Sequence, residues 1–299
     1  MSYTQHYEQW RSDPLRYWRQ RAKALSWTAP PRQIFDGSSG PYGRWFPGGQ
    51  LNTSYNCLDR HVESGSGERA ALIWDSAMTG EVRTFTYREL TERVAKLAGA
   101  LADAGVGKGD GVVIYMPMIP EAAVAMLACA RLGAVHSVVF GGFAAPELAS
   151  RIRAAAPKVV VTASCGLEPG RIIDYKGILD AALASLDQPV RTCLILQRPQ
   201  SVAELTPGRD LDFAQAEASA GPHLPVSVAA TDSLYVLHTS GTTGRPIGVV
   251  RDNGGHAVAL TSSMSMIFGL GPGDVMWAAS DGDGSSATAT SCTRRCWPD

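Results

Sequence analysis

Short apolar segments alternate with amphipathic helical segments along most of this 299-residue chain, and this alternation most constrains its fold. Apolar runs bounded by turn residues predict strands, whereas the segments 120–132 and 145–154 predict helices. Strands that are apolar throughout are typical of a sheet buried on both faces, and intervening helices favour parallel pairing. We therefore predict an α/β fold whose helices cover a mostly parallel sheet, with ligands at the carboxyl ends of its strands. The expected strands are 112–116, 135–140, 159–162, 192–196 and 234–237.

The clearest helix precedes the first of these strands. Leu90, Val94, Leu97 and Leu101 are spaced by four, three and four residues, so they lie on one face of a helix. Gly105 is the residue type expected just past the end of such a helix.

Three other segments are interpreted from their composition. The first thirty residues carry aromatic residues and leucines at mixed helical spacings until Pro30 and Pro31, which cannot continue a helix. Residues 36–50 are rich in Gly and Pro and are interpreted as a covering loop. Residues 199–230 are rich in Pro, Ala and Ser and are interpreted as a surface excursion, not a domain boundary.

Charge and composition argue against several classes of protein. The formal net charge is −1 and no run of like charges is present, so no nucleic-acid surface is indicated. No apolar run approaches the roughly 20 residues needed to cross a bilayer, and the N-terminus lacks a secretory pattern. We therefore expect a cytoplasmic protein with neither membrane nor nucleic-acid partners. The 6 cysteines form no CxxC or zinc-ligand spacing, which predicts reduced thiols and no protein-bound metal.

The most informative segment is residues 234–248, with the sequence LYVLHTSGTTGRPIG. A buried strand leads into small hydroxyl and glycine residues, and an apolar helix begins near Gly254. Glycines let the backbone approach a polyphosphate closely, while hydroxyl and amide groups donate hydrogen bonds to its oxygens. The Walker pattern GxxxxGK[ST] is absent. The segment resembles the signature loop of adenylate-forming enzymes, TSGTTGxPKG, which implies that the ATP phosphates contact Thr239, Ser240, Gly241, Thr242, Thr243, Gly244 and Gly248.

One position departs from this signature. Ile247 stands where the family usually has a lysine, and isoleucine offers neither charge nor donor to a phosphate. Arg245 is close in the sequence but cannot be assumed to replace that lysine. The departure bears on whether the chain is active, and it does not weaken the resemblance to the family.

Two further stretches narrow the resemblance. Residues 43–61, with the sequence GRWFPGGQLNTSYNCLDRH, and residues 7–10 before them resemble the N-terminal region of acetyl- and propionyl-CoA synthetases. In residues 136–143, with the sequence HSVVFGGF, a strand ends in a double glycine that resembles the turn against the nucleotide end of coenzyme A, which implies that Gly141 and Gly142 contact coenzyme A. On its own, a double glycine after a strand would be only a tight turn.

A third stretch, residues 165–171, resembles the segment whose arginine pairs with the coenzyme A 3′-phosphate. That arginine is Arg171, and a planar guanidinium can donate two parallel hydrogen bonds to a phosphate. Acetyl-type enzymes tend to carry a second arginine where this chain has Glu168, and residues 249–260 also resemble the propionyl type. The resemblance therefore favours propionate over acetate as the substrate.

The resemblance implies an acid–CoA ligase that uses ATP, Mg²⁺ and coenzyme A. The carboxylate is already nucleophilic, so the protein mainly supplies positioning and charge neutralisation. No catalytic residue is assigned, because lone histidines such as His238 and His256 are more often structural. The expected organisation is an acetyl-CoA-synthetase-type N-terminal region at 1–62, then a partial AMP-binding domain at 63–281. Together they would form an incomplete N-terminal domain of the adenylate-forming fold.

The last segment, residues 282–299, has a different character because it contains no Val, Ile, Leu, Met or Phe. Reverse translation in a shifted frame allows the apolar sequence GWVVGHSYIVYAPLLAG, so we interpret the segment as an out-of-frame tail. We accordingly expect the chain to be inactive alone. Two alternatives stay open: a non-catalytic nucleotide- or coenzyme A-binding pseudoenzyme, and an acetyl-CoA synthetase or another acid ligase. A scaffold protein is the least favoured.

Overall fold

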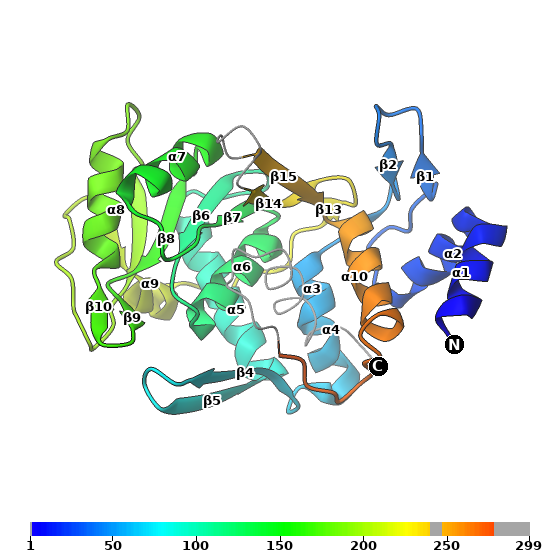
Figure 1. Ribbon diagram of the computed structural model, residues 1–299, viewed down its shortest axis with the longest axis horizontal. Helices are drawn as coiled ribbons and strands as arrows, with labels where there is room; N and C mark the ends of the chain where they lie inside the picture. Colours follow the sequence, from blue (N-terminus) through cyan, green and yellow to red (C-terminus); the bar gives the residue numbers. More distant parts are fainter. Residues whose placement is uncertain (1, 240–246, 278–299) are drawn as a thin grey trace.

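The computed structural model describes residues 2–239 and 247–277. The predicted phosphate contacts at 240–244 and the predicted tail at 282–299 therefore lie outside the described residues. The described chain is built around a seven-stranded sheet with the order β12-β11-β8-β6-β7-β14-β15 (Figure 1). Neighbouring strands are parallel from β12 to β14, whereas β14 and β15 are antiparallel. The strands are β6 Gly111–Tyr115, β7 Val135–Val138, β8 Val159–Ala163, β11 Thr192–Leu196, β12 Asp210–Asp212, β14 Ser233–Thr239 and β15 Ile247–Asp252.

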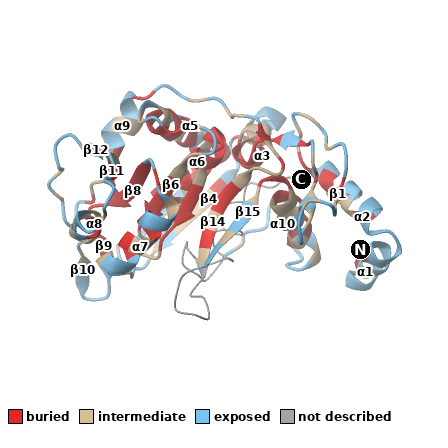
Figure 2. Ribbon diagram, turned by 90° about the horizontal axis from the view of Figure 1, so that it is seen from above, coloured by how far each residue is buried: buried red, intermediate tan, exposed pale blue. Residues whose placement is uncertain are grey.

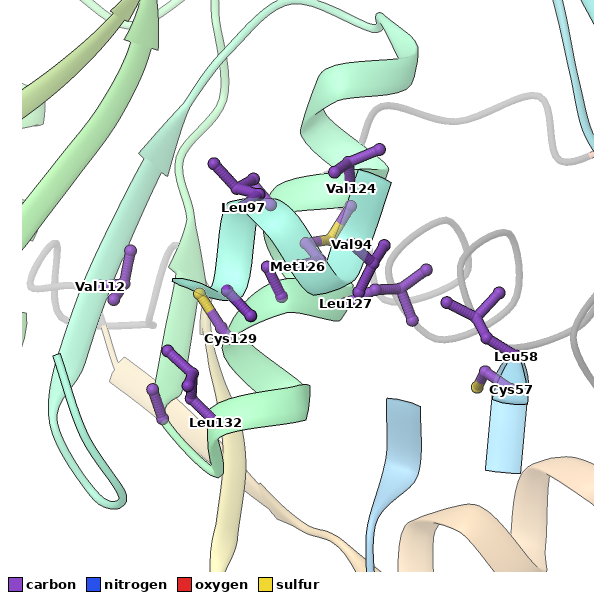
Figure 3. Close-up of a cluster of buried hydrophobic side chains, with 14 of the residues drawn as sticks. Cys57, Leu58, Val94, Leu97, Val112, Val124, Met126, Leu127, Cys129 and Leu132 are labelled. Atoms are coloured by element: carbon purple, nitrogen blue, oxygen red, sulfur yellow. The ribbon is translucent and has the colours of Figure 1, made fainter. Parts of the chain in front are cut away.

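Helices cover both faces of this sheet, as the sequence predicted (Figure 2). One face packs against α5 Tyr87–Asp103, α6 Pro120–Leu132 and α9 Phe213–Ser219, and the other against α7 Ala145–Ala155 and α8 Tyr175–Ala184. Alternate residues of each strand enter the two cores because side chains point to opposite faces along a strand. Ile114, for example, belongs to the first core and Tyr115 to the second. Figure 3 shows part of the first core, in which side chains of α5 and α6 gather beside Val112 of β6.

The helix α5 confirms the periodicity argument, because Leu90, Val94, Leu97 and Leu101 are all buried. It begins with a capping box in which Thr86 and Glu89 bond each other's backbone N–H groups. The predicted bounds of α6 are also confirmed.

Four shorter pairs of strands surround the sheet, and each pair is antiparallel. The pair β4–β5 is the longest, and it was not predicted from the sequence. The pair β3–β13 joins the N-terminal region to a segment almost 180 residues later, since Leu51 pairs with Val228. These strands are β1 Phe35–Asp36, β2 Arg44–Trp45, β3 Gln50–Leu51, β4 Ala70–Ser76, β5 Glu81–Thr86, β9 Gly166–Glu168, β10 Arg171–Ile173 and β13 Val228–Ala229.

Two interpretations of the sequence were wrong in part. The segment 36–50 is not only a covering loop, because its first part lies in a hairpin formed by β1 and β2. The segment 199–230 is more than a surface excursion, because it supplies the edge strand β12 and the helix α9, whose Phe213 is fully buried. Its polar sequence is accommodated by ion pairs: the buried Asp210 carboxylate lies 3.0 Å from Lys176 Nζ and 2.7 Å from Arg209 Nε. Paired charges can be buried in a strand that composition alone predicts as loop.

The N-terminal region packs against helix α10, Gly254–Met266, which follows β15 (Figure 1). The Thr53 hydroxyl donates to Asn253 Oδ1 at 2.7 Å, and the Tyr17 hydroxyl contacts Met266 Sδ at 2.8 Å. The predicted helical character of the first residues is confirmed, although the last helical turn ends at Ala24, before Pro30. No helix in the described ranges is long and apolar enough to span a membrane. The helices of this region are α1 Tyr3–Ser12, α2 Pro14–Arg21, the 3₁₀ turn Ala22–Ala24, α3 Thr53–Cys57, α4 Asp59–His61 and the π turn Val62–Ser66.

Candidate functional site

A turn of two glycines follows β7 at the carboxyl end of the sheet. The turn closes through a bond from the Phe143 N–H to the Phe140 carbonyl at 3.1 Å. From the neighbouring strand β6, the Tyr115 hydroxyl donates to the carbonyls of Gly141, at 3.3 Å, and Phe143, at 3.0 Å. Burial, reinforced by Tyr175, raises the pKa of Tyr115, so this hydroxyl keeps the proton that it donates. The predicted coenzyme A turn is thus anchored to the middle of the sheet.

The ring of Tyr175, in the first turn of α8, explains why two positions at this edge are glycine. A Cβ at Gly141 would overlap the Tyr175 hydroxyl, and a Cβ at Gly166 would overlap ring atom Cε2. Tyr175 is buried and its ring lies 4.7 Å from that of Tyr115, centroid to centroid. The Asp174 carboxylate caps α8 by accepting from the Gly177 N–H at 2.8 Å. Tyr175 therefore connects the turn after β7 with the hairpin β9–β10 after β8.

Arg171, the predicted partner of the coenzyme A 3′-phosphate, lies in β10 of that hairpin. It forms an ion pair with Glu168, the opposite residue of β9, with 2.7 Å between Arg171 Nε and Glu168 Oε2. Both side chains are exposed. The structure links Arg171 to the glycine turn only indirectly, because Gly166 contacts Tyr175 and Tyr175 contacts Gly141. The guanidinium is accessible to a phosphate, and Glu168 orients it.

The predicted phosphate segment begins and ends on the paired strands β14 and β15. Thr239 lies opposite Ile247, and His238 lies opposite Gly248. A Cβ at Gly248 would come within 2.9 Å of Val236 Cγ1, so the glycine permits close packing between these two strands. The side chain of Ile247 is 54% exposed. Within the described residues, the structure thus brings the two ends of the segment together at one edge of the sheet.

Two polar side chains that were not predicted from the sequence, those of Ser137 and Arg151, interact with His238. Its Nδ1 lies 3.2 Å from the hydroxyl of Ser137 on β7. Burial, together with the charge of Arg151 on α7, lowers the pKa of His238. Arg151 is itself buried, and its guanidinium carbon lies 5.5 Å from the centre of the Phe143 ring. No single stretch of sequence signals this group, because its members come from two strands and a helix far apart in the chain.

His256, in the first turn of α10, belongs to a second polar group. The Tyr235 hydroxyl is 3.0 Å from His256 Nε2, and the ring of the buried His136 lies 5.5 Å from that of Tyr235. Burial lowers the pKa of His256 to about 4 and that of His136 to about 3. Both imidazoles are therefore neutral near pH 7, and they pack as uncharged rings between β7, β14 and α10. The interpretation of His256 as structural fits this environment.

The described residues bring no group of three or more His, Cys, Asp or Glu side chains together in a way that could hold a metal ion. The four cysteines in the described ranges, Cys57, Cys129, Cys165 and Cys193, carry free, buried thiols. Mg²⁺ commonly binds through one or two carboxylates together with substrate phosphates, so a dedicated protein cage is not required for it.

Comparison with protein families gives two matches that together cover most of the chain. The model of the AMP-binding enzyme family matches residues 58–281. The model of the acetyl-coenzyme A synthetase N-terminus matches residues 3–57.

Curated relatives match over nearly the same residues. An uncharacterized protein of Pseudomonas aeruginosa is 52% identical over 282 residues, which are 94% of this chain and 45% of that protein. The human mitochondrial acyl-CoA synthetase short-chain family member 3 is 50% identical over 93% of this chain and 41% of its own length. The acetyl-coenzyme A synthetase of Mycobacterium bovis is 43% identical over 92% of this chain and 43% of its own length. The chain therefore spans less than half the length of these relatives.

Proposed function

This chain belongs to the AMP-binding enzyme family, in its acyl-CoA synthetase branch, and from that membership we propose that it supplies the phosphate- and coenzyme A-facing half of a short-chain acid–CoA ligase. In the proposed reaction a carboxylate oxygen attacks the α-phosphorus of ATP, and pyrophosphate leaves. The coenzyme A sulfur then attacks the acyl carbon of the adenylate, and AMP leaves with the bonding electron pair. Both steps need positioning and charge neutralisation more than a protein nucleophile.

The single observation that carries this proposal is that the two strands leading into these motifs, β7 and β14, are neighbours in the sheet. The glycine turn follows β7, and the sequence TSGTTG joins β14 to β15. Strands β7 and β14 are parallel neighbours, so their carboxyl ends lie side by side. Carboxyl ends of parallel strands are where open α/β sheets bind ligands. A nucleotide and coenzyme A bound at these motifs would meet at this edge.

We propose propionate, ahead of acetate, as the acid. Support comes from residues 249–260, whose sequence resembles the propionyl type. It also comes from Glu168, which pairs with Arg171 in place of a second arginine. A cytoplasmic location stays a prediction, as does the interpretation of residues 282–299 as an out-of-frame tail.

The alternative is a non-catalytic protein that binds the nucleotide or coenzyme A without completing the reaction. Ile247 favours it, because the position lacks the cation expected beside the phosphates. The two proposals agree that the 299-residue chain binds at least one of the two ligands. They differ in whether a protein continued in frame after Asp281 would catalyse the reaction.

We expect the 299-residue chain to bind MgATP and coenzyme A in calorimetry and to form no propionyl-CoA. The same chain with its frame shifted by one base after Asp281, and the gene read onward, should form propionyl-CoA with release of AMP. Binding without restored synthesis would favour the non-catalytic alternative. Preference of the repaired protein for a long-chain or aromatic acid would contradict the substrate assignment.

We expect Ile247→Lys to tighten MgATP binding. A charge-assisted bond to a phosphate contributes about 1.5–3 kcal/mol when desolvated. Because Ile247 is 54% exposed, solvent screening should reduce the gain to about 1 kcal/mol, or roughly fivefold in Kd. Ile247→Met is the matched control, since it adds a long side chain without charge. Equal affinities of the lysine and methionine variants would remove any role for charge at this position.

A further inference from the structure

His238, Ser137 and Arg151 form a polar cluster that neither the sequence resemblance nor the family match assigns to a ligand. They come from β14, β7 and α7; His238 directly precedes the TSGTTG sequence, and Arg151 packs on Phe143 of the glycine turn. The sequence separation between Ser137 and His238 is 101 residues, yet their side chains are 3.2 Å apart because β7 and β14 are adjacent. Ser137 is buried, whereas His238 is partly exposed.

The contact with Ser137 fixes the orientation of the imidazole. When the Ser137 hydroxyl donates to Nδ1, the proton of the neutral ring is on Nε2. Burial and the Arg151 charge lower the pKa of His238 from its ordinary value of 6.5, so the ring is neutral at pH 7. Nε2 lies on the side of Gly248, only 3.6 Å from the place where a Cβ would stand. Because Gly248 has no side chain, that residue places no Cβ against Nε2.

Arg151 brings positive charge to the same place. Its guanidinium packs over the ring of Phe143, the residue that ends the glycine turn, and its side chain is buried. A charge in a low-dielectric environment acts over a longer distance than one in water. With that tautomer, the cluster offers one N–H donor on His238 and a buried cation close enough to lower the pKa of that ring, at an edge where the signature lysine is replaced by Ile247.

We propose that His238 and Arg151 form a phosphate subsite: His238 Nε2–H donates to a phosphate oxygen of the bound ligand, and Arg151 supplies the positive charge that Ile247 does not. Ser137 is a positioning residue, since it acts through His238. The inference rests on the proposed function, because the phosphate is that of a bound substrate. The same chemistry fits the triphosphate of ATP and the pyrophosphate group of coenzyme A, so both are tested.

The experiment measures binding of MgATP, and separately of coenzyme A, to the 299-residue chain by calorimetry. His238→Phe keeps a ring and removes both nitrogens, while His238→Gln keeps an N–H donor near the position of Nε2. We expect the phenylalanine variant to bind at least one of the two ligands about tenfold more weakly, because it loses a hydrogen bond to a charged phosphate. The affinity of the glutamine variant should stay within about threefold of that of wild type. His223→Phe is the control, since His223 is a partly exposed histidine outside the cluster. It should leave both affinities unchanged.

The positioning and charge roles are tested with two further pairs. Ser137→Ala should weaken binding by less than His238→Phe, and it should have no additional effect in the His238→Phe background. Arg151→Met should weaken binding, and Arg151→Lys should restore most of it, since the charge is kept. Melting temperatures of all variants report whether each one folds.

The outcomes separate the subsite from the proposed function. Weakened MgATP binding alone assigns the subsite to the nucleotide, and weakened coenzyme A binding alone assigns it to coenzyme A; both results support the subsite. Wild-type affinities in a folded His238→Phe variant would overturn it while leaving the proposed function intact. Failure of the folded wild-type chain to bind either ligand would overturn the proposed function and the subsite with it.

Discussion

Asp59→Asn should lower the free energy of unfolding by about 3–5 kcal/mol, the cost of removing one partner from a buried ion pair. Asp59, in α4, accepts two parallel bonds from Arg131 near the end of α6, with N–O distances of 2.7 and 2.8 Å. The Arg131 side chain is only 4% exposed and that of Asp59 14%. Asparagine keeps the size of the side chain but removes the charge, so a desolvated guanidinium would be left without its counter-ion.

The pair matters beyond its two residues because it joins separate parts of the fold. Arg131 Nε also donates to the His223 carbonyl at 2.6 Å, in the segment that leads to β13. Beside it, the Asn52 side-chain amide donates to the carbonyls of Ala130, Arg131 and Val226. The N-terminal region, α6 and the segment before β13 are thus held together by a few buried polar groups.

Urea denaturation monitored by tryptophan fluorescence would measure this loss. The matched control is Glu68→Gln, which removes the carboxylate from the Glu68–Arg88 pair; these side chains are 77% and 51% exposed, and we expect no measurable change. A double variant, Asp59→Leu with Arg131→Met, should recover part of the loss, because an apolar pair leaves no buried charge. An unfolding midpoint for Asp59→Asn equal to that of wild type would contradict the assigned importance of the pair.

The sheet and its helices could be predicted because their signals are local. Strand β11 and helix α6 have the predicted bounds, and β8 and α7 each differ by one residue at one end. In each case an apolar run or a repeat of apolar positions coincides with one element. The general place of the site could also be predicted, since the carboxyl end of the sheet follows from the order of strands and helices.

What could not be predicted depends on partners distant in the sequence. The strand β12 is polar, and burial of Asp210 is made acceptable by its ion pairs with Arg209 and with Lys176, 34 residues earlier. The strand β15 was missed because it begins directly after the TSGTTGRP sequence. It pairs with β14 at the edge of the sheet, and its side chains are exposed or only partly buried. The cluster of Ser137, Arg151 and His238 has no local pattern, since adjacency of β7 and β14 alone brings it together.

Gly141→Ala should weaken coenzyme A binding by more than about tenfold and lower stability by about 1–3 kcal/mol, the usual cost of overpacking. The added Cβ would overlap the Tyr175 hydroxyl. The ring cannot simply move aside, because Gly166 contacts its other edge and Tyr115 packs against it. The turn would therefore be displaced instead, and with it the backbone that we propose coenzyme A approaches.

A second substitution separates this cause from a general effect of alanine in a turn. Tyr175→Phe removes the hydroxyl, after which the nearest Tyr175 atom to the new Cβ would be Cζ at 3.0 Å, a distance that small shifts can relieve. Gly141→Ala combined with Tyr175→Phe should therefore recover most of the lost stability and affinity. Gly166→Ala should not be rescued in this way, because its Cβ would overlap the ring atom Cε2, which phenylalanine keeps. A double-mutant cycle from urea melts and coenzyme A calorimetry measures both couplings. Equal rescue of the two alanine variants, or of neither, would mean that the Tyr175 hydroxyl does not determine the shape of the glycine turn.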